Sequence, residues 1–156
     1  MTAGGSPGDQ PPLALYLVKQ LELAIRSIMD ERLRPHGLTT LQYTALSVLA
    51  QRDDLSSAQL ARRSFVRPQT MHQMIQALAE RGLVERRADP GNRRVLLVGL
   101  SQDGLRLLRE CEPLVRDIED RMLAGMPDEQ RESFRGALAQ GCSALSGLSR
   151  PGLAAE

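Results

Sequence analysis

Apolar side chains recur every three or four residues along most of the chain, which is the spacing of one face of an α-helix. The first such run predicts a helix from about Leu13 to Leu33, and the segment RPHG ends it with a proline and a glycine. The apolar positions of this helix are Leu17, Leu21, Ala24, Ile25, Ile28 and Leu33. The chain therefore begins its ordered part with a long amphipathic helix.

Two further helices are predicted to start with a capping box, in which a hydroxyl and a glutamine three residues later bond each other's backbone N–H groups. Thr39 and Gln42 form this pair in TTLQYTALSVLAQ, and Ser56 and Gln59 form it in SSAQLARR. The buried stripes predicted for these helices are Leu41, Ala45, Val48 and Leu49 in the first, and Leu60 and Ala61 in the second. The second of the two is brief.

A fourth helix is predicted from about Pro68 to Arg81, because proline suits a first helical turn and Gly82 suits the position just past the end. One face of this helix is apolar, with Met71, Met74, Ile75 and Leu78. The opposite face carries Gln69, His72, Gln73 and Gln76 at helical spacing. Amides and imidazoles can donate to and accept from base edges in a major groove, whereas solvated helix faces more often carry Glu and Lys.

The stretch DPGNRRVLLVGLS, residues 89–101, predicts the second half of a β-hairpin. Two short strands, Leu83 to Arg86 and Val95 to Leu100, flank a loop whose Asp-Pro-Gly-Asn composition forces a turn. Arg93 and Arg94 would then lie at the tip of this hairpin.

Two helices are predicted after the hairpin, one from Ser101 and one from the segment MPDEQ. Their apolar stripes are Leu105, Leu108, Cys111, Val115, Ile118 and Met122 in the first, and Phe134, Leu138, Gly141, Leu145 and Leu148 in the second. These stripes exceed what the small preceding region could cover. Either a second copy of the chain buries them across a two-fold axis or they form an intramolecular bundle, and hydrophobic spacing does not separate the two.

The charge is unevenly distributed along the 156 residues, although the net charge is only +1. Between Ser56 and Val98 eight arginines face three acidic residues, whereas the rest of the chain has twelve basic and sixteen acidic residues. One contiguous third of the chain is thus a basic patch on an acidic protein, which suggests a polyanion as partner. The alternative is a solvated face that is rich in arginine.

Several function classes are disfavoured by the sequence. The length suits one domain, and no window approaches the roughly 18 consecutive apolar residues of a membrane span. The segment MTAGGSPGDQPP lacks a basic flank and an apolar core, so it reads as a flexible tail and a cytoplasmic location is expected. The two histidines, His36 and His72, have no nucleophile or carboxylate pair arranged beside them, and no phosphate-binding or dinucleotide motif is present. We therefore expect neither an enzyme, nor a cofactor, nor a metal site.

Three helices followed by a hairpin, with a polar outer face on the third helix, predict a winged helix-turn-helix. The fold class expected is mainly α with a small β-hairpin wing, a winged helix-turn-helix DNA-binding domain plus a helical dimerisation domain. The recognition helix (about 68–81) would enter the major groove, and the wing (about 89–94) would reach phosphates or the minor groove. The alternative function is a dimeric protein-interaction module that has lost specific DNA binding.

The chain resembles the MarR family of bacterial transcriptional regulators over about Leu13 to Leu148. The landmarks are GLTTLQYTALSVL, SSAQLARR, MIQALAERGLVERRADP and NRRVLLVGLSQDG. The family's wing signature, Asp-x-Arg followed by Val-x-Leu-Thr, corresponds here to Asn92, Arg94, Val98, Leu100 and Ser101. Ser101 can replace threonine as a helix cap, whereas Asn92 replaces the aspartate thought to brace the wing arginine and offers only a neutral hydrogen bond.

The resemblance implies a homodimeric repressor that binds a near-palindromic double-stranded DNA operator. The expected organisation is a flexible tail over 1–12, a dimerisation helix over 13–37, the winged region over 38–100, dimerisation helices over 101–148 and a second tail over 149–156. The residues expected to contact DNA are Arg67, Gln69, Thr70, His72, Gln73 and Gln76 on the recognition helix and Asn92, Arg93 and Arg94 on the wing.

Regulators of this family are typically released from DNA by a small phenolic or lipophilic effector held between the dimer domain and the winged domain. Aromatic residues make up only 3% of this chain, so few rings are available, and the candidates for ligand contact are Tyr16, Tyr43 and His36. Some relatives sense oxidants through a cysteine. Cys111 and Cys142 both fall inside predicted helices among apolar neighbours, where buried thiols are usually inert.

Overall fold

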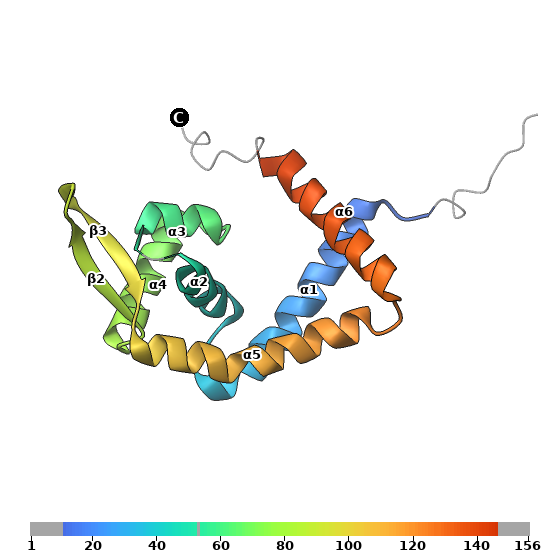
Figure 1. Ribbon diagram of the computed structural model, residues 1–156, viewed down its shortest axis with the longest axis horizontal. Helices are drawn as coiled ribbons and strands as arrows, with labels where there is room; N and C mark the ends of the chain where they lie inside the picture. Colours follow the sequence, from blue (N-terminus) through green and yellow to red (C-terminus); the bar gives the residue numbers. More distant parts are fainter. Residues whose placement is uncertain (1–10, 53, 147–156) are drawn as a thin grey trace, which may run out of the picture.

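The computed structural model describes residues 11–52 and 54–146 (Figure 1). Six α-helices, one short 3₁₀ helix and three strands make up this part of the chain, so it is mainly α with a small sheet, as predicted. The tail predicted over 149–156, most of the tail predicted over 1–12 and the stripe residue Leu148 lie outside the described residues.

All six predicted helices are present, and the first and fourth α-helices, for which both ends were predicted, agree with the prediction to within one residue. In chain order they are α1 (Ala14–Leu33), the 3₁₀ helix η1 (Arg34–His36), α2 (Thr40–Gln51), α3 (Ser57–Arg63), α4 (Pro68–Glu80), α5 (Gln102–Leu123) and α6 (Asp128–Ser146). The segment RPHG, predicted to end the first helix, forms a single turn of 3₁₀ helix, and Gly37 ends this turn with a left-handed φ of 69°.

Both capping boxes are confirmed. The Thr39 hydroxyl accepts from the Gln42 N–H at 3.2 Å, and the Gln42 side chain accepts from the Thr39 N–H at 3.1 Å. The same reciprocal pair joins Ser56 and Gln59. These bonds satisfy backbone donors that the first helical turn leaves without a partner, which explains why α2 and α3 begin where they do.

The sheet has three antiparallel strands, β1 (Leu55–Ser56), β2 (Val84–Asp89) and β3 (Asn92–Leu100), in the order β1-β3-β2. The sequence predicted only two strands, and β1 was missed. Two residues are too few to show an alternating pattern, and this pair extends only by bonding to β3, where Leu55 lies opposite Val98.

The hairpin is longer than predicted, and its turn is narrower. Its strands continue to Asp89 and from Asn92, which leaves Pro90 and Gly91 as the turn. The loop predicted between Arg86 and Val95 is therefore too long. Arg93 and Arg94 lie in β3 close to the turn, where the register with β2 shifts. The Asp89 carboxylate accepts from the Gly91 N–H at 2.9 Å and stabilises the turn.

A single hydrophobic core joins the winged region to the helices on either side. Its fully buried large side chains are Leu33, Leu46, Leu49, Leu60, Met71, Leu78, Val98 and Cys111. They come from α1, α2, α3, α4, β3 and α5, so the end of α1 and the first half of α5 are packed into the same core as the winged region. In Figure 1, α5 runs from the sheet at one end of the molecule to α6 at the other.

The outer parts of the helical arms lack such cover. All of α6 lies within the described residues and none of its side chains is buried, and α1 buries only Met29 and Leu33. Cys142 on α6 is consequently exposed, so the expectation that both thiols are buried is wrong for Cys142. Within the described ranges, no helix combines the length and the apolar character that crossing a membrane requires.

Candidate nucleic-acid interface

Helix α4 has one face in the core and one in solvent. Pro68 occupies its first turn, where a missing N–H costs nothing, and Gly82 follows its end with a left-handed φ of 71°. The four apolar residues Met71, Met74, Ile75 and Leu78 are buried, as the pattern predicted. The helix is therefore held firmly by its inner face.

The outer face of α4 and its first turn hold the six side chains predicted to contact DNA. All six are exposed: Arg67, Gln69, Thr70, His72, Gln73 and Gln76. The structure brings them together at one helix surface. There they offer hydrogen-bond donors for phosphate oxygens, and donors and acceptors for base edges. Their contact with DNA stays a prediction.

Phe65 is a feature of this region that the sequence pattern did not identify. It lies in the turn between α3 and α4, has a φ of 54° and is 87% exposed. The left-handed backbone conformation favours glycine and is uncommon for a bulky residue. The exposed ring is not held in this position by packing in the core. The sequence feature that could have identified Phe65 is an aromatic residue in the turn of the helix-turn-helix, where glycine is common.

The wing presents Asn92, Arg93 and Arg94 in exposed positions on β3. The side-chain oxygen of Asn92 accepts from the backbone N–H of Arg94 at 3.2 Å. Among the described residues, no hydrogen bond or ion pair joins Asn92 to the Arg94 guanidinium, so Asn92 stabilises the backbone of the strand and leaves the charged group available.

A separate ion pair braces the wing further from its tip. The Arg87 guanidinium on β2 bonds the carboxylate of Asp54, which precedes β1 and has a φ of 54°. The same carboxylate lies 3.1 Å from the position that a Cβ on Gly99 of β3 would occupy. The sequence reading missed this brace, because the two partners are 33 residues apart and neither belongs to the wing signature.

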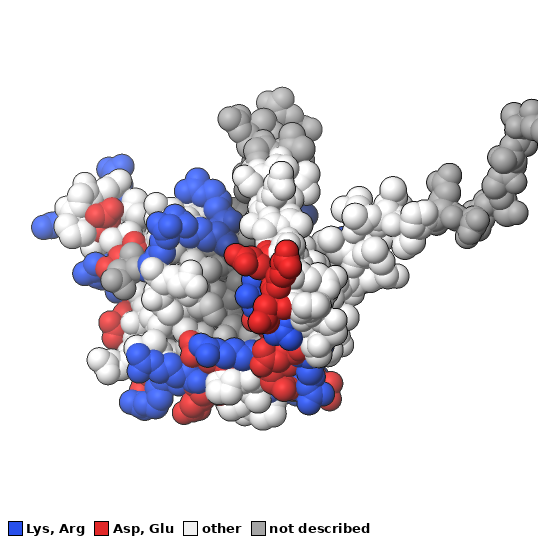
Figure 2. Space-filling view, turned by 45° about the vertical axis from the view of Figure 1, so that its right-hand side comes forward, with Lys and Arg blue, Asp and Glu red and all other residues white. Residues whose placement is uncertain are grey.

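On the face seen in Figure 2, basic side chains are spread over the part of the molecule that carries the wing and along its lower edge, with acidic side chains among them, whereas the outer parts of the two arms carry few charged atoms. The arginines between Ser56 and Val98 are all exposed: Arg62, Arg63, Arg67, Arg81, Arg86, Arg87, Arg93 and Arg94. The basic third of the sequence is thus a basic surface in the structure. A surface of this kind attracts a polyanion at long range.

A carboxylate ties α1 to the winged region. Asp30 accepts from both the backbone N–H and the hydroxyl of Thr40, at 2.8 and 2.7 Å, at the first residue of α2. These hydrogen bonds hold the pKa of Asp30 below its ordinary value. Bonds to the charged form lower a carboxyl pKa, so the ionised group stabilises this junction.

A second carboxylate links α1 to α5. Asp117 accepts from Arg32 of α1 at 2.5 Å and from Arg121 of its own helix at 3.0 Å. The hydrogen bond from Arg32 is the main cause that lowers the pKa of Asp117. These contacts hold α1 against α5 and so fix the direction in which α1 extends away from the core.

An apolar groove of about 530 Å³ lies between α1 and α5. Its lining comprises Leu21, Ala24, Ile25, Ile28, Glu31, Arg32, Ile118, Arg121 and Met122. None of the three residues predicted for ligand contact is in this lining. Tyr43 lines a smaller hollow between α2 and α5, while Tyr16 and His36 lie at opposite ends of α1, so the structure does not bring the three together.

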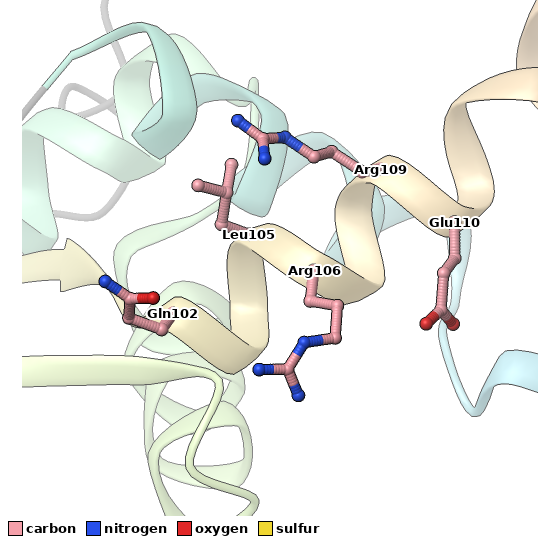
Figure 3. Close-up of a pocket in the computed structure, with 5 residues that line it drawn as sticks. All are labelled: Gln102, Leu105, Arg106, Arg109 and Glu110. Atoms are coloured by element: carbon pink, nitrogen blue, oxygen red, sulfur yellow. The ribbon is translucent and has the colours of Figure 1, made fainter.

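Another hollow lies along α5 and is lined by Gln102, Leu105, Arg106, Arg109 and Glu110 (Figure 3). The guanidinium groups of Arg106 and Arg109 leave the helix in different directions. Arg106 is also paired with Asp103 at 3.1 Å. The two charges therefore do not converge on one anion.

The remaining histidine and buried cysteine side chains lie on separate elements. Within residues 11–52 and 54–146, no three His, Cys, Asp or Glu side chains are grouped so that they could hold a metal ion. His36 and His72 lie on η1 and α4, outside any nucleophilic arrangement. Burial raises the pKa of the Cys111 thiol, which makes it a poor nucleophile.

Comparisons with known proteins agree with this geometry. Residues 36–95 match the sequence model of the MarR family. The chain is 34% identical over 127 residues to the HTH-type transcriptional repressor Rv2887 of Mycobacterium tuberculosis, covering 81% of this chain and 91% of the relative.

Solved structures share the fold. A MepR–DNA complex from S. aureus superposes with a TM-score of 0.77 at 20% identity, over 86% of this chain and 100% of that one. CouR from Rhodococcus jostii RHA1 bound to p-coumaroyl-CoA superposes with a TM-score of 0.74 at 24% identity, over 86% and 93%.

Proposed function

The chain belongs to the MarR family of transcriptional regulators, and from this premise we propose that it is a dimeric repressor that binds a near-palindromic DNA operator. The observation that carries the proposal is the pairing of α4 with the wing. One element presents exposed amides and an imidazole, and the other, the hairpin that follows it in the chain, presents exposed arginines.

In this proposal α4 enters the major groove. Gln69, Gln73 and His72 are placed to meet base edges, which carry sequence information, while Arg67 at the start of the helix meets a phosphate. Arg93 and Arg94 reach the adjacent backbone or the minor groove from β3. MepR, which shares the fold, has been solved as a complex with DNA.

Dimerisation is supported by the apolar residues that the rest of the described chain leaves exposed. On α1 and just before it they are Leu13, Leu15, Tyr16, Leu17, Val18, Leu23 and Ile28, and on α6 they are Leu138 and Leu145. An intramolecular bundle would have buried α6, and α6 has no buried residue. A second copy, packed through α1 and α6 about a two-fold axis, would cover both helices. The dimer would then place two recognition helices on the same operator.

We assign the groove between α1 and α5 to a small lipophilic or phenolic effector that releases the repressor in the cytoplasm. Its lining is largely apolar with three charged groups at its edge, which suits an amphipathic molecule. CouR, of similar fold, binds p-coumaroyl-CoA. Because α1 belongs to the proposed dimer interface, a ligand in this groove would change the distance between the two recognition helices.

The proposal is tested by selecting duplexes from a random library with the purified full-length chain and footprinting the selected sequence. We expect an inverted repeat whose half-sites are about one helical turn, roughly 10 bp, apart centre to centre, and a dimer at micromolar concentration by analytical ultracentrifugation. Affinity should fall steeply with salt, because bound arginines displace counterions. A monomer, an asymmetric single half-site or a flat salt response would instead favour the protein-interaction module.

A further inference from the structure

The end of the recognition helix is tied by a charged side chain to the joint between α1 and α2. Arg81 caps the C-terminus of α4, and its guanidinium donates to the carbonyl of Gly37 at 2.6 Å and to the carbonyl of His36 at 3.4 Å. These carbonyls belong to η1 and to the glycine that ends it. The contact joins residues that are 44 and 45 positions apart.

The joint that receives this side chain is held from its other side as well. η1 continues directly from α1, and Asp30 of α1 holds the first residue of α2 through two hydrogen bonds. The shared core holds α4 against the end of α1, and the short segment that both Asp30 and Arg81 contact constrains their relative orientation further.

The two hydrogen bonds from Arg81 to the carbonyls of Gly37 and His36, called the Arg81 tie below, are not needed to bury α4. That helix is anchored by Met71 and Leu78, which are fully buried, whereas the bonds of Arg81 are exposed. An exposed bond contributes little to folding but can select one direction for a helix end. Arginine suits this purpose because its planar fork can bond two carbonyls at once.

We propose that Arg81 is a positioning residue, which fixes the angle between the recognition helix and α1 and thereby sets the half-site spacing that the repressor accepts. The inference rests on the dimer and operator proposed above. Since α1 carries the proposed dimer contacts, an angle fixed at this joint in each protomer becomes a fixed distance between the two recognition helices.

Two glycines provide a matched pair of variants. Gly37 and Gly82 have nearly equal left-handed φ values of 69° and 71°, so alanine costs a similar backbone strain at each. A Cβ on Gly37 would lie 2.9 Å from the Arg81 guanidinium and displace it, whereas a Cβ on Gly82 meets no described atom within 4 Å outside its two chain neighbours. Gly37→Ala thus disturbs the tie, and Gly82→Ala is its control.

The experiment uses the full-length chain and duplexes that carry two inverted copies of the half-site selected by the wild type, with the spacing changed one base pair at a time. We expect the wild type to lose at least about fivefold in affinity when the spacing moves one base pair from its optimum. For Arg81→Met and Gly37→Ala, the loss of affinity at a spacing one base pair from the optimum should be less than about half of the wild-type loss. For Gly82→Ala it should equal the wild-type loss. Arg81→Lys keeps the charge but lacks the planar guanidinium, so its loss of affinity should lie between those of the wild type and Arg81→Met.

A double-variant test separates positioning from general damage. If Gly37→Ala acts by displacing Arg81, it should flatten the spacing dependence no further in the Arg81→Met background. An unchanged spacing profile in Arg81→Met, with circular dichroism confirming folding, would overturn the inference, as would a Gly82→Ala profile as flat as that of Gly37→Ala. Failure of the wild type to prefer any spacing would overturn the proposed operator instead.

Discussion

The side-chain oxygen of Asn92 accepts a hydrogen bond from the backbone N–H of Arg94, two residues further along the same strand, at 3.2 Å. Asn92 occupies the place of the aspartate that braces the wing arginine in the family pattern. In this chain it stabilises the strand, and the brace to the wing comes from Asp54 and Arg87.

Replacing Asn92 by aspartate tests whether charge or order in the wing limits DNA binding. A carboxylate could pair with Arg94, but exposed ion pairs contribute only about 0–1 kcal/mol, and it would add a negative charge near the phosphates. We expect Asn92→Asp to bind the selected operator equally or more weakly in a gel-shift titration at fixed salt. Clearly tighter binding would mean that wing disorder limits affinity.

Arg94 and Gln73 should differ in their effect on specificity. Arg94→Ala should weaken binding to operator and to random DNA alike and lower the slope of log affinity against log salt by about one, as expected for a lost phosphate contact. Gln73→Ala should cost about 1–3 kcal/mol on the operator and leave random DNA nearly unaffected. Fluorescence anisotropy on both duplexes at several salt concentrations measures this, and equal losses on both duplexes for Gln73→Ala would exclude base readout.

Gly104 marks a close approach between α5 and the start of the wing. A Cβ at this position would lie 2.1 Å from the backbone carbonyl oxygen of Leu83, which is part of the fold and cannot move aside cheaply. Gly104→Ala should therefore lower the free energy of unfolding by about 2–3 kcal/mol in urea denaturation. Gly136→Ala is the control: outside its chain neighbours and the backbone of its own helix its Cβ would meet no described atom within 4 Å, and alanine should stabilise α6 by about 0.5–1 kcal/mol.

Asp30 should make part of the stability depend on pH. Its pKa is lowered in the folded chain by the hydrogen bonds from Thr40, so its contribution is complete above the ordinary value of 3.8 and is lost as the pH falls through the lowered value. Asp30→Asn should lower the free energy of unfolding by about 1 kcal/mol at pH 7. Measured by urea denaturation, the difference from the wild type should shrink on acidification below pH 3.8, and a constant difference would contradict the role of the charge.

Cys111 should not act as an oxidant sensor. It is fully buried and its thiol pKa is raised, first by burial and then by the nearby Glu110. In Cys142→Ser, where Cys111 is the only thiol, maleimide labelling should be far slower for the native than for the urea-unfolded chain. Cys111→Ala should respond to peroxide as the wild type does in DNA binding, and a response that disappears in this variant would show that Cys111 is reached in solution.

The sequence by itself determined the elements whose causes are local. Capping boxes join residues three positions apart, and the period of 3.6 residues separates the buried Met71 from the exposed Gln73 without reference to the rest of the chain. The six helices, the capping boxes that begin α2 and α3 and the face of α4 that holds the candidate DNA contacts were therefore predictable, although contact with DNA itself stays a prediction.

The tertiary structure decided what depends on partners distant in sequence. β1 is a strand only because Leu55 and Ser56 pair with β3. Arg93 and Arg94 lie in β3 at a register shift, between Asn92, which pairs with Asp89, and Leu96, which pairs with Ala88. The tie from Arg81 to Gly37 spans 44 residues, and the exposure of Cys142 depends on what α6 packs against. Hydrogen bonds and burial of this kind arise only when the fold brings the partners together, so no local pattern of residue types specifies them.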